Sequence, residues 1–449
     1  MLRFGTDGVR GVANAELTPE LALALGRAAA RVLGGDRCAI GRDTRRSGPL
    51  LEAALAAGLA AEGVEVTLLG VVPTPEVAWW SATEGAPAAM VSASHNPFPD
   101  NGIKLFSAGG RKLADDVEDR IEHELRALLA GRAVPPDPSV PVPTGAALGG
   151  IAPVAGPPHA GYAASVAASL GGRRLDGLTA VVDCAHGSAS VVAPRVLTGL
   201  GVDVSVLHCE PDGTNINDGC GSTHPDALIR EVVARGADVG IAFDGDADRV
   251  LLVDGAGNLV DGDHIIAICA IDRHDRGVLA GDSVVVTVMT NLGFRLAMEK
   301  RGIDVVETAV GDRYVLEALE ARGLALGGEQ SGHVIFRDLA TTGDGLLTAV
   351  QALDALVRSG RPLDDLAAGA MTRLPQVLRN VRVTSGAAEA VAALAPAVAA
   401  VEARLGPQGR VLVRPSGTEP LVRVMAEAPT AAEAEAAVSE LVEAVTRLD

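Results

Sequence analysis

Ser94 stands in a position where a serine can do chemistry. It comes soon after the apolar run 88–91, which predicts a buried strand, and the segment 96–102, Asn-Pro-Phe-Pro-Asp-Asn-Gly, carries strong turn signals. A serine at the mouth of a strand, on so stiff a loop, is expected to be presented rather than buried. That is the geometry of a nucleophile or a phosphate carrier. Taken alone, however, such a serine more often caps its own loop.

Three carboxylates follow a second apolar run about 150 residues later. Residues 237–243 predict a buried strand that leads into Asp244, Asp246 and Asp248. At a spacing of two they are expected on one side of an extended segment, where a divalent cation would offset their repulsion. Oxygen ligands favour magnesium, calcium or manganese over zinc, and a magnesium ion with three such ligands has room for water and a phosphate oxygen. The alternative, a solvated acidic turn, fits poorly with delivery by a buried strand.

The triad does not begin a calcium-binding EF-hand loop. Such a loop needs glycine at its sixth position and an acidic residue at its twelfth, where this chain has Arg249 and Gly255.

Two further loops have the composition of recognition sites. Residues 414–418, Arg-Pro-Ser-Gly-Thr, offer a guanidinium, hydroxyls and a glycine that lets backbone amides approach an anion, and Arg423 is close by. The Walker lysine pattern is missing, so a phosphate cradle of another kind or an ordinary β-turn is expected. Glu329, Ser331 and His333 alternate along one side of a loop that we expect to be extended, which suits hydroxyl recognition or a structural turn.

Ser94 and His95 are not expected to form a hydrolase pair. Neighbouring residues of an extended strand point in opposite directions, and the Gly-x-Ser-x-Gly elbow is absent. Four features remain: a serine, a cation site, an anion-binding loop and a loop suited to binding hydroxyl groups. Together they indicate phosphoryl transfer on a small phosphorylated polyol.

A strand–helix–strand unit that recurs along the chain is expected to position these loops. Its first copy ends at Ser94, its second runs from 179 to the Asp244 loop, and its third runs from 283 to the loop 327–333. Three such copies predict three similar α/β domains whose polar loops meet in a shared cleft. The Pro/Gly-rich stretch 135–158 reads as a linker with a boundary near 150, and the tail after about 370 changes character.

Composition excludes several functional classes. The 449 residues include 48% hydrophobic residues and carry a net charge of −19, which argues against a nucleic-acid or acidic-membrane partner. Five dispersed cysteines without a Cys-x-x-Cys motif are expected as reduced thiols of a cytoplasmic protein. Cys209, Cys220 and His224 lack a fourth ligand and regular spacing for zinc. The first residues resemble no signal peptide, and no uncharged apolar run is long enough for a membrane span.

A set of motifs in a fixed order resembles the α-D-phosphohexomutases over essentially all 449 residues, and among them most closely the bacterial phosphoglucosamine mutases. The motifs are Phe-Gly-Thr-Asp-Gly-Val-Arg-Gly at 4–11, Ser-Ala-Ser-His-Asn-Pro at 92–97, Asn-Gly-Ile-Lys at 101–104, Cys-Gly-Ser-Thr-His at 220–224, Asp-Gly-Asp-Ala-Asp-Arg at 244–249, Gly-Asp-Arg-Tyr-Val at 311–315, Gly-Glu-Gln-Ser-Gly-His at 328–333 and Arg-Pro-Ser-Gly-Thr-Glu-Pro at 414–420.

The resemblance implies a role for each matching residue. Ser94 would be the phosphoserine, and one magnesium ion would be held by Asp244, Asp246, Asp248 and a phosphoserine oxygen. The matching catalytic positions are Arg10, Lys104 and His333; the sugar contacts are Glu329 and Ser331; the phosphate site is Arg414, Ser416, Gly417, Thr418 and Arg423.

The same resemblance implies the fold and the reaction. It implies α/β domains at 1–152, 153–252 and 253–369 and a TATA-box-binding-protein-like α+β domain at 370–449, around one central cleft. The implied reaction interconverts glucosamine 6-phosphate and glucosamine 1-phosphate through a bisphosphorylated sugar, as a step toward UDP-N-acetylglucosamine and cell-wall synthesis. A homodimer and a kinase or bisphosphate that primes Ser94 are possible partners. Two alternatives are a phosphomannomutase/phosphoglucomutase and a catalytically silent phosphosugar-binding protein.

Overall fold

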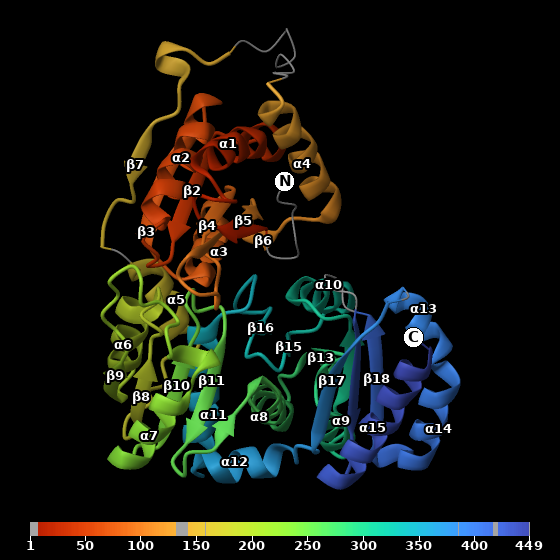
Figure 1. The fold of residues 1–449 in the computed structure, drawn as a ribbon. Helices are drawn as coiled ribbons and strands as arrows, with labels where there is room; N and C mark the ends of the chain where they lie inside the picture. The colour runs from red at the N-terminus through yellow and green to blue at the C-terminus, as the bar shows by residue number, and fades with distance from the viewer. Residues whose placement is uncertain (1–7, 132–141, 158, 385, 416–420, 449) are drawn as a thin grey trace. The chain divides into compact units, whose positions relative to one another are not determined.

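The computed structural model describes residues 8–131, 142–157, 159–384, 386–415 and 421–448 (Figure 1). Contacts divide the chain into two units. The first contains residues 1–288 and 306–367, and the second contains residues 289–305 and 368–449. Among the described residues, no helix is long and apolar enough to cross a membrane.

The first sheet has the strand order β1-β5-β4-β2-β3-β7, with β6 paired to β5. Strands β4, β2, β3 and β7 are parallel neighbours, while β5 runs antiparallel to both β4 and β1. The elements up to residue 153 are β1 (Val9–Val12), α1 (Pro19–Leu33), β2 (Arg37–Arg42), α2 (Gly48–Ala61), β3 (Glu65–Val71), α3 (Thr74–Glu84), β4 (Ala88–Val91), β5 (Asp100–Ser107), β6 (Arg111–Lys112), α4 (Asp115–Leu129) and β7 (Ile151–Pro153).

The second sheet repeats this order as β12-β11-β10-β8-β9. Strands β10, β8 and β9 are parallel, and β11 returns antiparallel to β10. Its elements are α5 (Ala160–Ala168), β8 (Thr179–Asp183), α6 (Ala189–Gly199), β9 (Asp203–Leu207), α7 (Asp226–Arg235), β10 (Val239–Phe243), β11 (Val250–Asp254) and β12 (Leu259–Val260).

The third sheet repeats it again as β14-β13-β15-β16, with β13 and β15 parallel and β16 antiparallel to β15. In all three copies the closing strand turns back through a hairpin, and that hairpin loop carries the polar residues singled out in the sequence. The elements are α8 (Gly262–Asp275), β13 (Ser283–Thr287), α9 (Leu292–Glu299), β14 (Asp304–Thr308), α10 (Asp312–Arg322), β15 (Leu326–Gly328), β16 (Val334–Phe336), α11 (Gly345–Ser359) and α12 (Leu363–Ala370).

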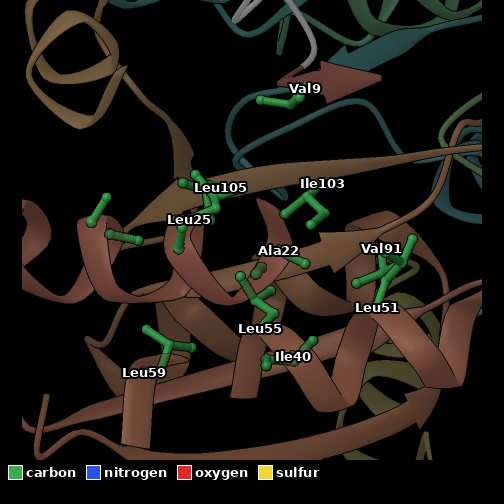
Figure 2. Close-up of a cluster of buried hydrophobic side chains, with 14 of the residues drawn as sticks. Val9, Ala22, Leu25, Ile40, Leu51, Leu55, Leu59, Val91, Ile103 and Leu105 are labelled. Atoms are coloured by element: carbon green, nitrogen blue, oxygen red, sulfur yellow. The ribbon is translucent and has the colours of Figure 1, made fainter. Parts of the chain in front are cut away.

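Alternating strand residues create two cores around the first sheet, because successive side chains of a strand point to opposite faces. Helices α1 and α2 cover one face, and α3 covers the other (Figure 1). Ile40 and Val91 point to the first face, where Figure 2 shows them with Leu25 of α1 and Leu55 of α2. Ala39, Ala88 and Met90 point to the α3 face. The expected helix start at Thr18 is confirmed, since its side chain accepts a hydrogen bond from Leu21 N and Pro19 opens α1.

The second unit contains a three-stranded antiparallel sheet in the order β17-β19-β18. Helices α13, α14 and α15 pack their buried residues against it in one core. The expected capping box is confirmed, because Thr430 Oγ1 accepts from Glu433 N while the Glu433 carboxylate accepts from Thr430 N. The elements are β17 (Gln376–Arg382), α13 (Ala387–Ala393), α14 (Ala395–Leu405), β18 (Arg410–Pro415), β19 (Leu421–Glu427) and α15 (Ala431–Leu448). Short 3-10 turns lie at 145–147, 221–223, 280–282 and 406–408.

Candidate active site

Two hairpin loops from different sheets meet at the centre of the candidate site. Ser94, after β4, donates a 2.5 Å hydrogen bond from its Oγ to Asp244 Oδ2, after β10. Asp244, Asp246 and Asp248 each place a carboxylate oxygen within 4.8 Å of the others. The serine and the aspartate triad, predicted from segments about 150 residues apart, therefore share one cluster.

Ser94 itself is buried, with 1% of its surface exposed, so the expectation of a presented serine was wrong. The reason is that the loop after β10 lies directly over it. Ser94 also has a φ of +52°, a left-handed conformation that costs a non-glycine residue roughly 1–2 kcal/mol and needs support from its surroundings.

The same left-handed backbone corrects a second expectation. Because residue 94 is not extended, its side chain and that of His95 point to the same side, and Ser94 Oγ lies 3.2 Å from His95 Nδ1. His95 Nδ1 also lies 3.3 Å from Arg249 Nη1. Burial, together with the charges of Arg249 and Arg10, lowers the pKa of His95. A neutral His95 suits a hydrogen-bond acceptor for Arg249.

The aspartate triad converges through a turn rather than along an extended segment, which corrects the predicted geometry. Residues 245–248 form turns and bends, and Ala247 has a φ of +55°. In an extended strand the first and last aspartates would be about 13 Å apart, because each residue advances the chain by about 3.3 Å. The reversal of the chain brings them together.

Lys104 on β5 places a buried ammonium between two of these carboxylates. Its Nζ lies 2.8 Å from Asp246 Oδ2 and 3.1 Å from Asp248 Oδ2. Burial would raise the pKa of Asp248, but Lys104, His333 and Arg249 outweigh it and hold the pKa well below its usual range. Burial and the charges of Asp248 and Asp246 instead raise the pKa of Asp244 well above its usual range. The pKa values of the first and last carboxyl groups of the triad are therefore displaced in opposite directions.

Thr74, at the start of α3, is a site residue that the sequence reasoning missed. Its backbone N donates to Asp246 O at 2.9 Å, and its hydroxyl donates to Asp246 Oδ2 at 2.7 Å. The signal available in the sequence was a Thr-Pro pair that opens a helix after a buried strand. Helix α3 therefore ties the first sheet to the loop of the second.

The third hairpin loop brings His333 to the cluster. His333 Nδ1 lies 3.8 Å from Asp248 Oδ1, and its Nε2 lies 3.2 Å from Asp312 Oδ2 at the start of α10. Burial opposes protonation of His333, but Asp312 and Asp248 outweigh it and raise its pKa. Asp312 also pairs with Lys112 on β6, and neither of these two residues was assigned a role from the sequence.

Glu329 and Ser331 lie on the turn of that third hairpin. The expected extended loop was wrong: Glu329 N bonds to His333 O and Gly332 N to Glu329 O, so the loop closes tightly. Glu329 Oε1 accepts a hydrogen bond from Gly311 N at 3.1 Å. The buried Ser331 hydroxyl has no hydrogen-bond partner among the described residues. A glycine is required at 343, where a Cβ would lie 2.2 Å from His333 Nε2.

Family models match this chain along most of its length. Phosphoglucomutase/phosphomannomutase alpha/beta/alpha domains I, II and III match residues 1–130, 160–257 and 261–374, and the C-terminal domain of the same family matches residues 378–444. The chain belongs to the phosphoglucomutase/phosphomannomutase family. The predicted fold class, three related α/β domains followed by a distinct C-terminal domain, is thereby confirmed.

Individual members of the family show the same full-length likeness. A phosphoglucosamine mutase from Frankia alni is 57% identical over 441 residues, which cover 95% of this chain and 94% of the Frankia protein. A phosphoglucomutase/phosphomannomutase family protein from Burkholderia thailandensis has a TM-score of 0.81 at 26% identity, covering 98% of this chain and 97% of its own. An Aspergillus fumigatus N-acetylphosphoglucosamine mutase, solved with GlcNAc-6P and magnesium, has a TM-score of 0.71 at 19% identity and covers 99% and 95%. Within the family, this chain groups with the phosphoglucosamine mutases.

Three further expected residues of this phosphohexomutase chain lie on strands β1, β18 and β19. Arg10 lies on β1, opposite Gly102 on β5. In the second unit Arg414 and Arg423 are directly opposite one another on β18 and β19. Burial, together with the charge of Arg423, lowers the pKa of Arg414. Ser416, Gly417 and Thr418 lie outside the described residues, as do residues 4–7 of the first motif.

The cysteines are all free, as the sequence led us to expect. Cys220 lies near Asp183 and His208 in a second group with potential metal ligands, a set different from the one weighed in the sequence. Asp183 is already engaged, because its Oδ1 accepts from Ala185 N and its Oδ2 accepts from His208 Nδ1 and Gly221 N. Through these bonds Asp183 connects the backbone at residues 185 and 221 to the His208 side chain, which accounts for the clustering of the three residues.

Proposed function

We propose that this chain interconverts glucosamine 6-phosphate and glucosamine 1-phosphate through phosphorylated Ser94 and a bisphosphorylated intermediate. It would act as an isomerase of the intramolecular phosphotransferase type, in the supply of UDP-N-acetylglucosamine and cell-wall precursors. The observation that carries the proposal is the 2.5 Å contact of Ser94 Oγ with Asp244 inside a buried cluster of carboxylates. Full-length likeness to the Frankia phosphoglucosamine mutase supports the choice of substrate.

Two phosphoryl transfers account for the reaction. First, the free hydroxyl of the sugar monophosphate loses its proton and binds the phosphorus, while the bond between that phosphorus and Ser94 Oγ breaks and Oγ takes up a proton. The bisphosphate then turns around, Ser94 Oγ loses its proton and binds the other phosphorus, and the bond from that phosphorus to the sugar oxygen breaks, so that this oxygen becomes a free hydroxyl. Catalysis is therefore mostly positioning and charge compensation, for which Arg10, Lys104 and His333 supply positive charge and proton carriers.

The proposed ligands of one Mg²⁺ are Asp244, Asp246, Asp248 and an oxygen of the phosphorylated Ser94. The donor set fits, because Asp246 Oδ1 and Asp248 Oδ1 are buried and accept no hydrogen bond among the described residues. Bound Mg²⁺ would offset the negative charge of the transferred group. Lys104 holds the other oxygens of Asp246 and Asp248, which orients these carboxylates.

Two other loops are proposed to bind the substrate. Glu329 and Ser331 would contact the sugar hydroxyls, for which the unpartnered Ser331 hydroxyl is supporting evidence. The anion site would comprise Arg414, Ser416, Gly417, Thr418 and Arg423, supported by the opposed guanidinium groups of Arg414 and Arg423. The Aspergillus relative in complex with GlcNAc-6P and magnesium supports both ligand classes. We retain the domain boundaries 1–152, 153–252, 253–369 and 370–449 as part of this proposal.

The proposal extends to location and partners. Free cysteines fit a reducing cytoplasm. The bisphosphorylated sugar would also act as an activator, since it or a kinase must first phosphorylate Ser94. A homodimer remains a prediction.

A relative-rate panel tests the function. The purified chain should convert glucosamine 6-phosphate faster than glucose or mannose phosphates in a coupled assay with Mg²⁺ and a catalytic amount of bisphosphate. Faster turnover of glucose or mannose phosphates would make the chain a phosphoglucomutase/phosphomannomutase instead. Binding of hexose phosphates without turnover of any of them would make it a silent binding protein.

A further inference from the structure

We propose that Arg45 is a positioning residue for phosphoryl transfer, because it fixes the peptide groups on both sides of Ser94 and so aims the serine hydroxyl at the aspartate cluster. This inference rests on the proposed function. Arg45 lies between β2 and α2, in the loop 41–48, to which the sequence analysis gave no chemical role.

The Arg45 guanidinium is completely buried, with 0% of its surface exposed. It donates to four main-chain carbonyl groups of the serine loop. Nη2 donates to Ser94 O at 2.9 Å and to Asn96 O at 2.8 Å, while Nη1 donates to Pro97 O at 2.5 Å and to Asp100 O at 3.0 Å. The loop therefore wraps around one planar cation.

Asp43 completes the arrangement from the other side of Ser94. Its carboxylate accepts from Arg45 Nε at 2.9 Å and from the Ser92 hydroxyl at 2.7 Å. The Ser92 hydroxyl in turn accepts from Ser94 N at 2.9 Å. The N–H of Ser94 is thus connected to Asp43 through the Ser92 hydroxyl, and its C=O is hydrogen-bonded directly to Arg45.

Holding both peptide groups fixes φ and ψ of the residue between them. Ser94 needs this support, because its φ of +52° is unfavourable for a serine. The direction of the Cα–Cβ bond follows from the backbone, so the clamp fixes the position of Cβ, and the hydrogen bond from Oγ to Asp244 then selects the side-chain rotamer. A guanidinium can do this because its donors form a rigid planar fork, whereas a lysine ammonium is a single point on a flexible stem.

A second donor reaches the same carbonyl oxygens from the second sheet's side of the site. Asn217 Nδ2 donates to Ser94 O at 2.8 Å and to Asn96 O at 3.1 Å. Asn217 Nδ2 and Arg45 Nη2 therefore donate to the same two carbonyl oxygens. Either donor should partly compensate for the loss of the other.

The decisive variant is Arg45→Lys, with Arg46→Lys as its matched control, since Arg46 is the exposed neighbour of Arg45. We expect Arg45→Lys to lower kcat by roughly ten- to hundred-fold, the effect of a small misplacement of a reacting group. KM should change by less than about threefold, because the described hydrogen bonds of Arg45 go to the serine loop and to Asp43, and none of them reaches Glu329 or Ser331. Arg46→Lys should keep both constants. Wild-type kcat in a folded Arg45→Lys variant would overturn the inference.

Amide hydrogen exchange separates positioning from general loss of stability. In Arg45→Lys, exchange should rise in the peptide that spans 92–104 and stay unchanged in the peptides of the second unit. A uniform rise over the whole chain, with kcat falling only in proportion to the unfolded fraction, would mean that Arg45 merely stabilises the fold. This readout needs no substrate, so it still judges Arg45 if the wild-type chain turns over no hexose phosphate and the proposed function fails.

Asn217→Gly provides a second variant should Arg45→Lys not fold. Glycine tolerates the positive φ of +58° at this position and removes the whole side chain, including the amide that donates to the serine loop. We expect a smaller fall in kcat, about two- to tenfold, with the same local rise in exchange. Wild-type kcat together with wild-type exchange in this variant would count against a clamp on the serine loop.

Discussion

The loops after β4 and β10 occupy equivalent places in their sheets, yet their shapes are maintained by different means. Each turns back after a buried closing strand, and each contains one non-glycine residue in the left-handed region, Ser94 in the first and Ala247 in the second. In the first loop that residue is the proposed phosphate carrier, and the buried Arg45 guanidinium holds its backbone. In the second loop it lies between two of the proposed metal ligands, and backbone contacts hold it, such as the hydrogen bond from Gly345 N to Ala247 O.

This difference indicates that the loops, rather than the strand order, determine the chemistry of the site. The four strands β5-β4-β2-β3 and β11-β10-β8-β9 follow the same order in the two sheets, so topology supplies only a position at the end of the strand that precedes each loop. A loop that must aim one atom needs a polar clamp, whereas a loop that gathers three carboxylates needs a reversal of the chain. Experiments that distinguish the two loops should therefore change single side chains.

Removal of the reactive atom in the first loop should have the largest effect. Ser94→Ala should abolish turnover almost completely, because the proposed phosphate carrier is lost, whereas Ser165→Ala, at an exposed position on α5, should keep wild-type rates. Peptide mass spectrometry of the active wild-type enzyme should find phosphate on Ser94. A fully active alanine variant would exclude the phosphoserine.

Loss of one carboxylate in the second loop should come next. Asp246→Asn removes a charge and a ligand from the proposed cation site, so kcat should fall by about a hundredfold or more. Chelation should abolish wild-type activity and added Mg²⁺ should restore it. Asp203→Asn, at the exposed start of β9, serves as the control. Activity that is indifferent to chelator would make the triad an acidic turn without a metal.

A smaller effect is expected from the arginine pair of the second unit, which lies outside both loops. Arg414→Ala should lower kcat/KM roughly ten- to hundred-fold, because a charge-assisted hydrogen bond contributes about 1.5–3 kcal/mol. Ser94 should remain phosphorylated, and Arg404→Ala, on the surface of α14, should behave as wild type. Calorimetry should find binding of both monophosphates weakened; if one were weakened and the other untouched, separate sites would hold the two phosphates.

The smallest effect concerns Asp344, a buried carboxylate that caps α11 rather than joining the triad. Burial raises its pKa to about 6, and Tyr162 donates to it at 2.8 Å. Because its folded pKa lies above the unfolded value of 3.8, the stability it contributes is fully present below about pH 4 and is lost as the pH rises through about 6. Asp344→Asn should remove this dependence, with a gain in melting temperature at pH 7.5 but not at pH 4.5. An equal slope of melting temperature against pH in both proteins would contradict the shift.

The sequence predicted the parts of the site that repeat a local pattern. Buried strands before Ser94 and Asp244 were readable as short apolar runs, and the helix cap at Thr18 was readable as a Thr-Pro pair. The threefold recurrence of strand, helix and strand was enough to predict three domains. These features depend on residues close together in the chain, where pattern and structure are directly linked.

Features that depend on distant residues were missed or misread. Ser94 appeared exposed because nothing near it in the sequence reveals that the loop after β10 covers it. The triad and the residue pair 94–95 were treated as extended because positive φ at serine or alanine has no sequence signal comparable to glycine. Thr74, Lys112 and Asp312 reach the cluster only through tertiary packing, so their roles had to come from the structure.

Helix α3 carries both tryptophans of the chain, Trp79 and Trp80, and its first residue, Thr74, grips Asp246. The tryptophan fluorescence of the protein therefore originates from a single helix attached to the proposed cation site. During a titration with Mg²⁺, the tryptophan emission of the unlabelled protein can report on that helix. The same measurement applies to every variant that keeps both tryptophans.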